Sequence, residues 1–548
     1  MFRRKFLFGV IAAMPLLMWA EEKADLSAIQ RIKTEAFENS KVMDTAFYLT
    51  DVYGGRVTNS PGYRAAADWA VTRLKEYGLS NVGLEKWSFG RGWSYSHFYG
   101  AMTEPQYMPL IGFPLAWSSG TSGKISGEPM IAVIRTEADM EKWKGKLKGK
   151  IVMTDAPRDL TPITSAALKR YSEQDLEKLA EAPEPGERSP MGVPQPNGAP
   201  NAMAQALGLP PGQPFDMQTF RRLRTRITAF LREEGVALVI NLPRTGDGGT
   251  VFGQSAGQQD VKDPMAVPTV AITAEHYNRI ARLLQHKIPV KVEFEVQAAA
   301  EDKDLNSVNV IAEIPGGKKK DEIVMIGAHL DSWHGGTGAT DNAAGCAVMM
   351  EAMRILKSSG VKLDRTVRMG LWGGEEEGLL GSKAYVKAHF ADPEVMKPSA
   401  EHAKLSAYYN YDNGTGKIRG IYTQSLDMEK PIFEAWTAPF RDLGMTTVSN
   451  RNTGGTDHLS FAAVGLPGFQ FIQDEVEYSA RTHHSNMDVY DRLQKGDLMQ
   501  AAAIVASFVY ETANREEMMP RRPLPKPQPA ERRGPPANTG EPRQRPSE

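Results

Sequence analysis

Histidine and carboxylate side chains with the spacing of a metal site follow a short apolar run in the second half of the chain. His329 and Asp331 come directly after residues 323–326, which predict a buried strand. Asp341 precedes residues 344–356, where apolar side chains recur at helical spacing. Since ligands of an open α/β sheet gather outside the carboxyl ends of its strands, the three side chains would share one crevice. Imidazole with carboxylates suits zinc or a similar divalent ion, although an aspartate before a helix also serves simply as an N-cap.

The same arrangement recurs along the rest of the chain. Three further apolar runs predict strands, and each is followed by acidic or histidine side chains at its carboxyl end. The runs and the residues after them are 367–372 with Glu375, Glu376 and Glu377, 405–411 with Asp412, and 469–472 with His483 and His484. Random surface charge would not follow strand polarity in this way, so the sequence predicts one shared site.

These residue types are sufficient for hydrolysis assisted by two metal ions. Two cations need about five protein groups, with one carboxylate shared between them and a free edge for water. The neighbouring glutamates Glu375 and Glu376 can divide the work, because one can coordinate metal while the other takes a proton from the attacking water.

With these motifs in this order, the sequence resembles the M28 zinc peptidases, which include exopeptidases with an inserted protease-associated (PA) domain. The resemblance covers the α/β part of the chain, and it extends more loosely to the inserted region through GKIVMTDA at 149–156. The matching motifs are AHLDSW at 328–333, GATDNAAG at 338–345, WGGEEEGLLGS at 372–382, NYD at 410–412 and HSNMD at 484–488.

The resemblance implies a ligand set for two zinc ions per chain, or for other divalent metals in their place. Asp341 would bridge the two ions. His329 and Asp412 would complete one site, and Glu376 and His484 would complete the other.

The resemblance also implies catalytic roles. Glu375 would be the general base, and Asp331 would orient a metal-bound histidine, while Glu377 has no assigned role. His483 departs from a common form of the motif, in which a tyrosine donates a hydrogen bond to the oxyanion of the tetrahedral intermediate. A histidine ring can donate the same bond, and the alternative that His483 is the ligand and His484 its neighbour stays open at this point.

The elements that must position these residues predict an α/β fold, with a mixed, mostly parallel sheet flanked by helices as in zinc exopeptidases. Residues 21–98 and 301–516 are predicted to form a discontinuous catalytic domain. In 99–300 short β-runs alternate with turns, which predicts an inserted β-rich, PA-like domain with a Pro-rich excursion at 182–214. Residues 517–548 carry almost no large apolar side chains and are predicted to be disordered.

Composition and the amino terminus bound the setting. The 548 residues have a formal net charge of −1, so no strong field favours nucleic acid, and the single cysteine, Cys346, excludes an intramolecular disulfide. Residues 1–20 combine a basic start with a short apolar run, which is typical of a cleaved signal peptide. We expect export to a periplasm or out of the cell, with no membrane anchor in the mature chain. The oligomeric state stays open.

Together these features predict a metal-dependent exopeptidase acting on peptide substrates, with cleavage expected at the amino end. A carboxypeptidase would need a cation for the terminal carboxylate, and Arg451 and Arg481 keep that alternative open. Two other classes are a single-zinc acyltransferase of the glutaminyl cyclase type and an inactive, receptor-like binding protein. The zinc content per chain separates the three classes, at two ions, one ion or none.

Overall fold

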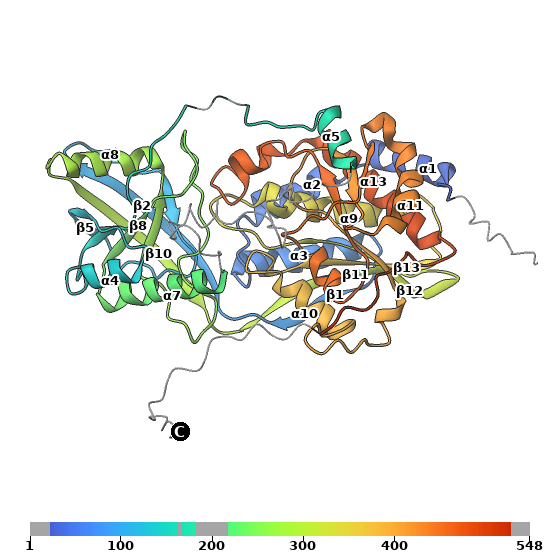
Figure 1. Ribbon diagram of the computed structural model, residues 1–548, viewed down its shortest axis with the longest axis horizontal. Helices are drawn as coiled ribbons and strands as arrows, with labels where there is room; N and C mark the ends of the chain where they lie inside the picture. The colour runs from blue at the N-terminus through green and yellow to red at the C-terminus, as the bar shows by residue number, and fades with distance from the viewer. Residues whose placement is uncertain (1–21, 163, 165, 182–216, 528–548) are drawn as a thin grey trace, which may run out of the picture.

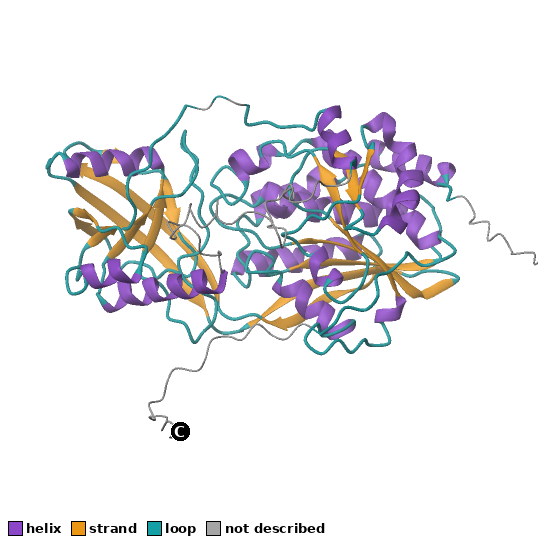
Figure 2. Cartoon of the chain, in the orientation of Figure 1, coloured by secondary structure: helices purple, strands orange, loops and turns teal. Residues whose placement is uncertain are grey.

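The protein has helices on both sides of a large sheet and a second group of strands beside it (Figures 1 and 2). The computed structural model describes residues 22–162, 164, 166–181 and 217–527. The predicted signal peptide 1–20, the Pro-rich excursion 182–214 and residues 528–548 of the predicted tail lie outside these ranges.

The large sheet carries the strands that the site motifs follow. Among the described residues its strands are, in order, β1 (Ser80–Ser88), β11 (Asn306–Ile314), β13 (Arg365–Trp372), β12 (Lys319–His329), β14 (Leu405–Asn410), β17 (Gly468–Gln473), β15 (Ile418–Tyr422) and β16 (Thr447–Ser449). The four central strands β13, β12, β14 and β17 are parallel, so their carboxyl ends lie at one edge. Antiparallel pairs occur at β1–β11, β11–β13 and β15–β17. The predicted α/β fold, with a mixed sheet flanked by helices, is confirmed.

Alternate side chains of the central strands enter two different cores. On β12, Val324 and Ile326 lie in the larger core, whereas Ile323 and Met325 lie in the smaller one, because successive side chains of a strand point to opposite faces. The helices of the larger core are α1 (Leu26–Glu38), α2 (Val42–Phe47), α3 (Pro61–Glu76), α9 (Ala344–Ser358), α11 (Lys430–Thr437) and α13 (Lys495–Asn514). Those of the smaller core are α10 (Leu380–His389) and α12 (His458–Ala462).

Residues 92–301, called the insert below, contain the strands of two smaller sheets. One has the order β3 (Met108–Pro109), β2 (Gly92–Glu104), β10 (Lys291–Glu301) and β5 (Ile125–Gly127). The other has the order β4 (Gly112–Pro114), β9 (Thr269–Ile272), β8 (Leu238–Asn241), β7 (Ile151–Met153) and β6 (Pro129–Ile131). Gly92 pairs with Glu301, so the chain leaves the large sheet and returns to it at adjacent points.

The insert differs in detail from its prediction. Strand β2 runs unbroken from Gly92, so the insert begins before the predicted boundary at residue 99. Its strands are accompanied by helices α4 (Glu137–Trp143), α7 (Met217–Glu233) and α8 (Ala274–Gln285), which lie with them at the left of Figure 1. Its identification as a PA-like domain stays a prediction.

One helix from the insert's sequence lies on the large sheet instead. Helix α5 (Glu173–Ala180) places Leu176 and Leu179 against Tyr422 and Ile472, and Figure 1 shows it apart from the insert's own strands. The prediction assigned this segment to the insert because of its position in the sequence. Its packing follows its apolar face, which finds a partner on β15 and β17.

The start of the predicted tail is packed against the rest of the chain. Met519 is 2% exposed, and its amide donates a hydrogen bond to Ser406 Oγ at 3.1 Å. The Arg521 guanidinium donates to the carbonyl of His402 at 3.0 Å. The prediction of disorder from residue 517 therefore differs from the structure over 517–527, because a buried methionine and an arginine bonded to carbonyls fix a segment whose average composition is polar.

Candidate active site

Six of the predicted site residues gather at the carboxyl ends of neighbouring parallel strands, as strand polarity predicts. His329 ends β12, Glu375 and Glu376 follow β13, Asp412 follows β14, Asp341 lies in the turn η2 (Ala339–Ala343) before α9, and His484 follows η6 (Tyr478–Thr482). Asn342 secures the start of α9, since its side-chain oxygen accepts the amide of Gly345 at 2.9 Å and its side-chain nitrogen donates to the carbonyl of Tyr411 at 2.9 Å.

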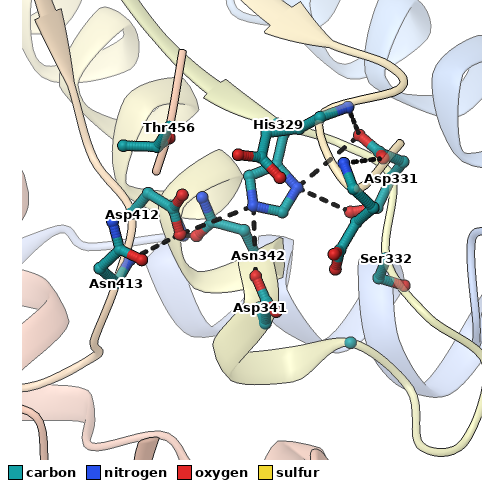
Figure 3. A network of polar contacts seen from close by, with 12 residues as sticks. His329, Asp331, Ser332, Asp341, Asn342, Asp412, Asn413 and Thr456 are labelled. Atoms are coloured by element: carbon teal, nitrogen blue, oxygen red, sulfur yellow. Dashed lines mark hydrogen bonds and ion pairs between the residues drawn. The ribbon is translucent and has the colours of Figure 1, made fainter. Parts of the chain in front are cut away.

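Asp341 lies between two histidines. Its Oδ1 is 3.2 Å from His329 Nε2, and its Oδ2 is 3.1 Å from His484 Nε2. Asp412 Oδ1 lies 3.6 Å from the same nitrogen of His329 (Figure 3), while Glu376 Oε2 lies 2.9 Å from His484 Nε2. We call His329 with Asp412 the inner half-site and Glu376 with His484 the outer half-site; Asp341 is shared between them.

The inner half-site is supported by residues of the large sheet and the loops at its edge. His329 Nδ1 lies 3.0 Å from the backbone carbonyl oxygen of Asp331 and 3.7 Å from its carboxylate (Figure 3). The carboxylate accepts the backbone amides of Glu375 at 3.2 Å and Glu376 at 3.1 Å. Asp331 therefore faces His329 with its carbonyl and fixes the glutamate loop with its side chain.

The shared and inner carboxylates are fixed through their own backbones. Asp488 accepts the amide of Thr340 at 2.6 Å and that of Asp341 at 3.2 Å. The side chain of Gln470 on β17 donates to the carbonyl of Asp412 at 2.6 Å. These bonds connect the turn before α9, the end of β14 and the loop 483–488, called the histidine loop below.

The outer half-site contacts the insert. Trp333 Nε1 donates to Glu376 Oε2 at 2.7 Å, and the Trp333 ring lies edge-on to Trp117 of the insert, with centroids 6.0 Å apart. His484 Nδ1 lies 2.7 Å from the side-chain amide of Gln254, which also belongs to the insert. His329 and His484 thus draw their supporting contacts from different parts of the chain.

The two half-sites differ in their access to solvent. The side chains of His329 and Asp412 are 1% and 3% exposed, whereas that of His484 is 18% exposed. A cavity of about 860 Å³ opens beside the outer half-site, lined by His483, His484 and residues of the insert. A substrate would therefore reach the outer half-site first.

The donor atoms at the centre of the site fit divalent cations. Among the described residues, His329 Nε2, Asp341 Oδ2 and Glu376 Oε1 are buried without a hydrogen-bond partner. The ligand atoms of His329, Asp341 and Asp412 lie within 4.8 Å of one another, as do those of Asp341, His483 and His484. Nitrogen and oxygen donors that converge without partners are suited to zinc-like ions.

The electrostatics of the site agree with this fit. Burial would lower the pKa of His329, but the nearby Asp412 and Glu375 carboxylates raise it well above its usual range. Burial and the Asp341 carboxylate raise the pKa of Glu376 to about 7, against the opposing effect of His484. Positive charge at the centre of the site would relieve the crowding of these carboxylates.

Glu375 lies beside the half-sites. Its carboxyl interacts electrostatically with His329, Asp412 and Glu376, and burial raises its pKa well above the usual range of a glutamate. A carboxyl in this position can accept a proton within the site without being needed as a ligand. The third glutamate of the run, Glu377, accepts a hydrogen bond from the Thr58 hydroxyl at 2.8 Å.

Two side chains compete for the role of oxyanion donor. His483 is 42% exposed at its side chain, and its Nε2 lies 3.8 Å from Asp341 Oδ2, farther than His484 Nε2. Tyr478 packs its ring 4.7 Å from the His483 ring. Burial raises the Tyr478 pKa well above its usual range, and the carboxylates of Asp341 and Asp412 raise it further, so the phenol is neutral and close to both half-sites.

The two arginines considered for a carboxypeptidase have other partners. Arg451 donates to the carbonyl of Lys178 at 2.8 Å, at the end of α5. Arg481 lies 3.4 Å from the carboxylate of Glu477 on its own loop.

Several residues of the site were not predicted, and four of them show why. Trp333 and Asp488 lie inside the AHLDSW and HSNMD motifs, so the motifs themselves contained the signal. Tyr478 lies on the same loop as His484, where an isolated tyrosine carries no distinctive pattern. Gln254 is 230 residues from His484 in the sequence, and only the folded insert brings the two together.

Comparisons with known proteins find relatives of the large-sheet domain and of most of the chain. Residues 309–509 match Peptidase family M28. Carboxypeptidase Q of Mus musculus is 24% identical over 475 residues, which are 86% of this chain and 86% of that protein. Aminopeptidase YwaD of Bacillus subtilis (strain 168) is 32% identical over 209 residues, which are 37% of this chain and 44% of that protein.

A solved structure has the same fold over nearly the full length. The Peptidase M28 precursor from Shewanella amazonensis SB2B aligns with a TM-score of 0.64 and 26% identity, covering 91% of this chain and 98% of that one. The match therefore includes both the large sheet and most of the insert.

Proposed function

Because this chain belongs to peptidase family M28 through residues 309–509 and is a metal-dependent peptidase, we propose that it is a two-zinc exopeptidase that removes residues from the amino end of peptides. The observation that carries the proposal is the position of Asp341. Its two carboxylate oxygens face His329 Nε2 on one side and His484 Nε2 on the other. A bridging carboxylate between two half-sites is suited to a pair of metal ions.

In this proposal each half-site holds one ion. His329, Asp412 and Asp341 would hold the first, and Glu376, His484 and Asp341 the second, with His484 preferred over His483 because its Nε2 lies closer to Asp341. When bound, the ions supply Lewis acidity, which lowers the pKa of a water and polarises the scissile carbonyl.

The chain's own residues would then move the proton and hold the charge. The Glu375 carboxylate would take a proton from the attacking water and pass it to the leaving amine. The ring nitrogen of His483 or the hydroxyl of Tyr478 would donate a hydrogen bond to the carbonyl oxygen as negative charge develops on it. Asp331 would keep Glu375 and Glu376 in register through their backbone amides.

The choice of the amino end is supported by the contacts of two arginines. Arg451 and Arg481, the cations considered for a terminal carboxylate, are bonded to other groups of the protein.

Cleavage at the carboxyl end is a second candidate, supported by one observation. The cavity that reaches His483 and His484 is also lined by Arg135, Arg224 and Arg244 of the insert. Arginines can bind a terminal carboxylate in a bidentate manner. The similarity to carboxypeptidase Q of Mus musculus, which covers 86% of each chain, agrees with this candidate.

One experiment separates these proposals. The purified protein is incubated with a short peptide that has both ends free, and with the same peptide acetylated at the amino end or amidated at the carboxyl end. We expect acetylation to abolish cleavage and amidation to leave it intact. The reverse result would establish the carboxypeptidase. Cleavage of none of the peptides, with fewer than two zinc ions per chain, would contradict the proposed function and favour the acyltransferase or receptor-like classes.

We further propose that the protein is exported, on the basis of the signal-like residues 1–20. In the part of the chain that the structure describes, every helix is too short or too polar to cross a bilayer. Detection of the mature amino terminus in the periplasm or the medium would test this proposal.

A further inference from the structure

A histidine that binds metal through one ring nitrogen normally has a hydrogen-bond acceptor at the other, which fixes the tautomer and the orientation of the ring. For His329 this acceptor is the carbonyl of Asp331, two residues away on the same loop. Among the described residues of its own loop, His484 has no such neighbour at Nδ1. This nitrogen is met instead by the side-chain amide of Gln254 at 2.7 Å. The contact crosses from the histidine loop to the insert.

The atoms of this contact fit a ligand histidine. Since Nε2 of His484 faces the carboxylates of Asp341 and Glu376, a metal at that nitrogen leaves the proton on Nδ1. The Nδ1–H group then donates to the side-chain oxygen of Gln254, which is reached by exchanging the oxygen and nitrogen positions of the carboxamide. Glutamine can therefore serve the metal-bound form of the histidine.

The backbone around Gln254 holds it in place for this role. The amide of Gly253 donates to the carbonyl of His484 at 3.0 Å, and the amide of Asn486 donates to the carbonyl of Val251 at 3.1 Å. The carbonyl of Gln254 itself accepts the amide of Ala116 at 3.0 Å within the insert. Residues 251–254 thus lie along the histidine loop as a short antiparallel pair, centred on the bridge between Phe252 and Ser485.

The histidine loop needs such support. His484 has φ = 64°, in the left-handed region that non-glycine residues seldom adopt. A residue keeps such a backbone conformation when its surroundings fix it, and here the contacts on the insert side of the loop come from residues 249–254.

We propose that Gln254 of the insert is a positioning residue for His484 and sets the affinity of the outer half-site for its metal ion. The proposal rests on the proposed two-zinc function. In this proposal the insert is part of the metal centre, because it fixes the tautomer of His484 with the proton on Nδ1 and the orientation of its ring. His329 has its acceptor on its own loop, so the inner half-site does not depend on the insert in this way. Removal of a hydrogen-bond partner of this kind typically lowers metal affinity by about 10- to 100-fold.

The test compares Gln254→Leu, which removes the acceptor, with Gln254→Glu, which restores it. Gln297→Leu, on the exposed part of β10 in the same insert, is the matched control. Each protein is loaded with two zinc ions and titrated with a chromophoric chelator, and kcat and KM are measured in excess zinc and in zinc-limited buffer. We expect Gln254→Leu to release one of its two ions at an about 10- to 100-fold lower concentration of free chelator than the wild type. The other ion should be released at the same concentration as in the wild type.

In the same series, excess zinc should restore most of the kcat of Gln254→Leu, and KM should stay near the wild-type value. Gln254→Glu and Gln297→Leu should retain both ions as the wild type does. Unchanged release of both ions by Gln254→Leu would overturn the proposal, and an increase in KM alone would show that Gln254 contacts substrate instead. A wild type that binds fewer than two ions would overturn the proposed function itself, so the two failures are distinguishable. Because the Gln254 side chain is exposed, Gln254→Leu should leave the thermal unfolding midpoint of the protein unchanged. This measurement checks that the variant is folded.

Discussion

The inner and outer half-sites use similar ligands but are supported in different ways. His329 and Asp412 lie at the ends of adjacent parallel strands and are almost completely buried. His484 lies on a loop, is partly exposed at its side chain, and is contacted by Gln254 of the insert. The inner half-site is therefore fixed by the fold of the large sheet, whereas the outer half-site depends on how the insert meets that sheet.

An aromatic cluster between the two regions has the same consequence. Trp333 follows β12 and holds Glu376 through its indole N–H, while its ring packs in one cluster with Trp93 and Trp117 of the insert. A shift of the insert would move Trp333 and Gln254 together. It would change the outer half-site and the cavity beside it, and it would leave the inner half-site in place.

Removal of the shared carboxylate should have the largest effect on metal binding and activity. Asp341→Ala removes the only residue common to both half-sites, so we expect both ions to be lost and activity to fall by several orders of magnitude. Zinc content per chain, measured after gel filtration, checks this. Asp442→Ala, at an exposed aspartate paired with Lys33, is the control and should keep both ions. Retention of one tightly held ion in Asp341→Ala would show that the half-sites do not share it.

The two neighbouring glutamates should separate chemistry from binding. Glu375→Gln should reduce kcat by roughly 10²- to 10⁴-fold with both ions retained, since it removes the proton acceptor only. Glu376→Gln should weaken binding of the outer ion and leave the inner one bound. Zinc content and kcat measured on both variants distinguish these effects. Loss of an ion from Glu375→Gln together with full occupancy in Glu376→Gln would reverse the assignment.

The oxyanion donor can be identified by two parallel changes. His483→Phe and Tyr478→Phe each remove one candidate hydrogen bond, and the true donor should cost about 10²- to 10³-fold in kcat with both ions bound. We expect the loss in His483→Phe if the sequence-based assignment holds. A loss confined to Tyr478→Phe would transfer the role to the buried phenol, and loss of zinc in His483→Phe would make His483 a ligand.

The smallest expected effect is on the junction with the insert. His334 Nε2 bonds to the carbonyl of Pro114 at 2.6 Å, and burial lowers the His334 pKa to about 4, against about 6.5 for an exposed histidine. Between these pH values the unfolded chain binds a proton here that the folded chain does not. Protonation of His334 in the unfolded chain therefore does not reduce the free energy of unfolding above about pH 6.5. As the pH drops from 6.5 towards 4, this protonation lowers the free energy of unfolding by at most about 3 kcal/mol.

The measurement is the unfolding free energy of the wild type and of His334→Gln between pH 7 and pH 4.5. The variant should lose less stability than the wild type as the pH falls, because its amide does not titrate. His97→Gln, at an exposed histidine of β2, should follow the wild type. Parallel curves for the wild type and His334→Gln would contradict the assignment of this pH dependence to His334.

Sequence reasoning predicted residues of both half-sites, but it missed the contacts with Gln254 and Trp333 that support the outer one. The family resemblance and the α/β fold are confirmed. Parallel strands bring the residues after their carboxyl ends to one edge of the sheet, wherever these residues lie in the sequence. That rule placed His329, Asp412, the glutamate run and the histidine pair at one edge of the sheet. It could not place Gln254, whose contact with His484 depends on how the insert packs against the domain of the large sheet.

The other differences have the same cause. Helix α5 was assigned to the insert by its sequence position, but its apolar face packs on β15 and β17. Residues 517–527 were predicted to be disordered from average composition, yet one methionine and one arginine anchor them. Local patterns predict elements and their polarity, whereas packing between distant surfaces depends on three-dimensional shape.

Stepwise removal of metal shows whether two unequal zinc sites share Asp341. The zinc-loaded protein is titrated with a chelator while bound zinc per chain is followed. We predict two ions per chain, released in two separate steps, with Glu376→Gln abolishing only the weaker step and Asp412→Ala abolishing the tighter one. Release of both ions in a single step that both variants weaken equally, or binding of only one ion, would show that the chain does not hold two unequal zinc sites.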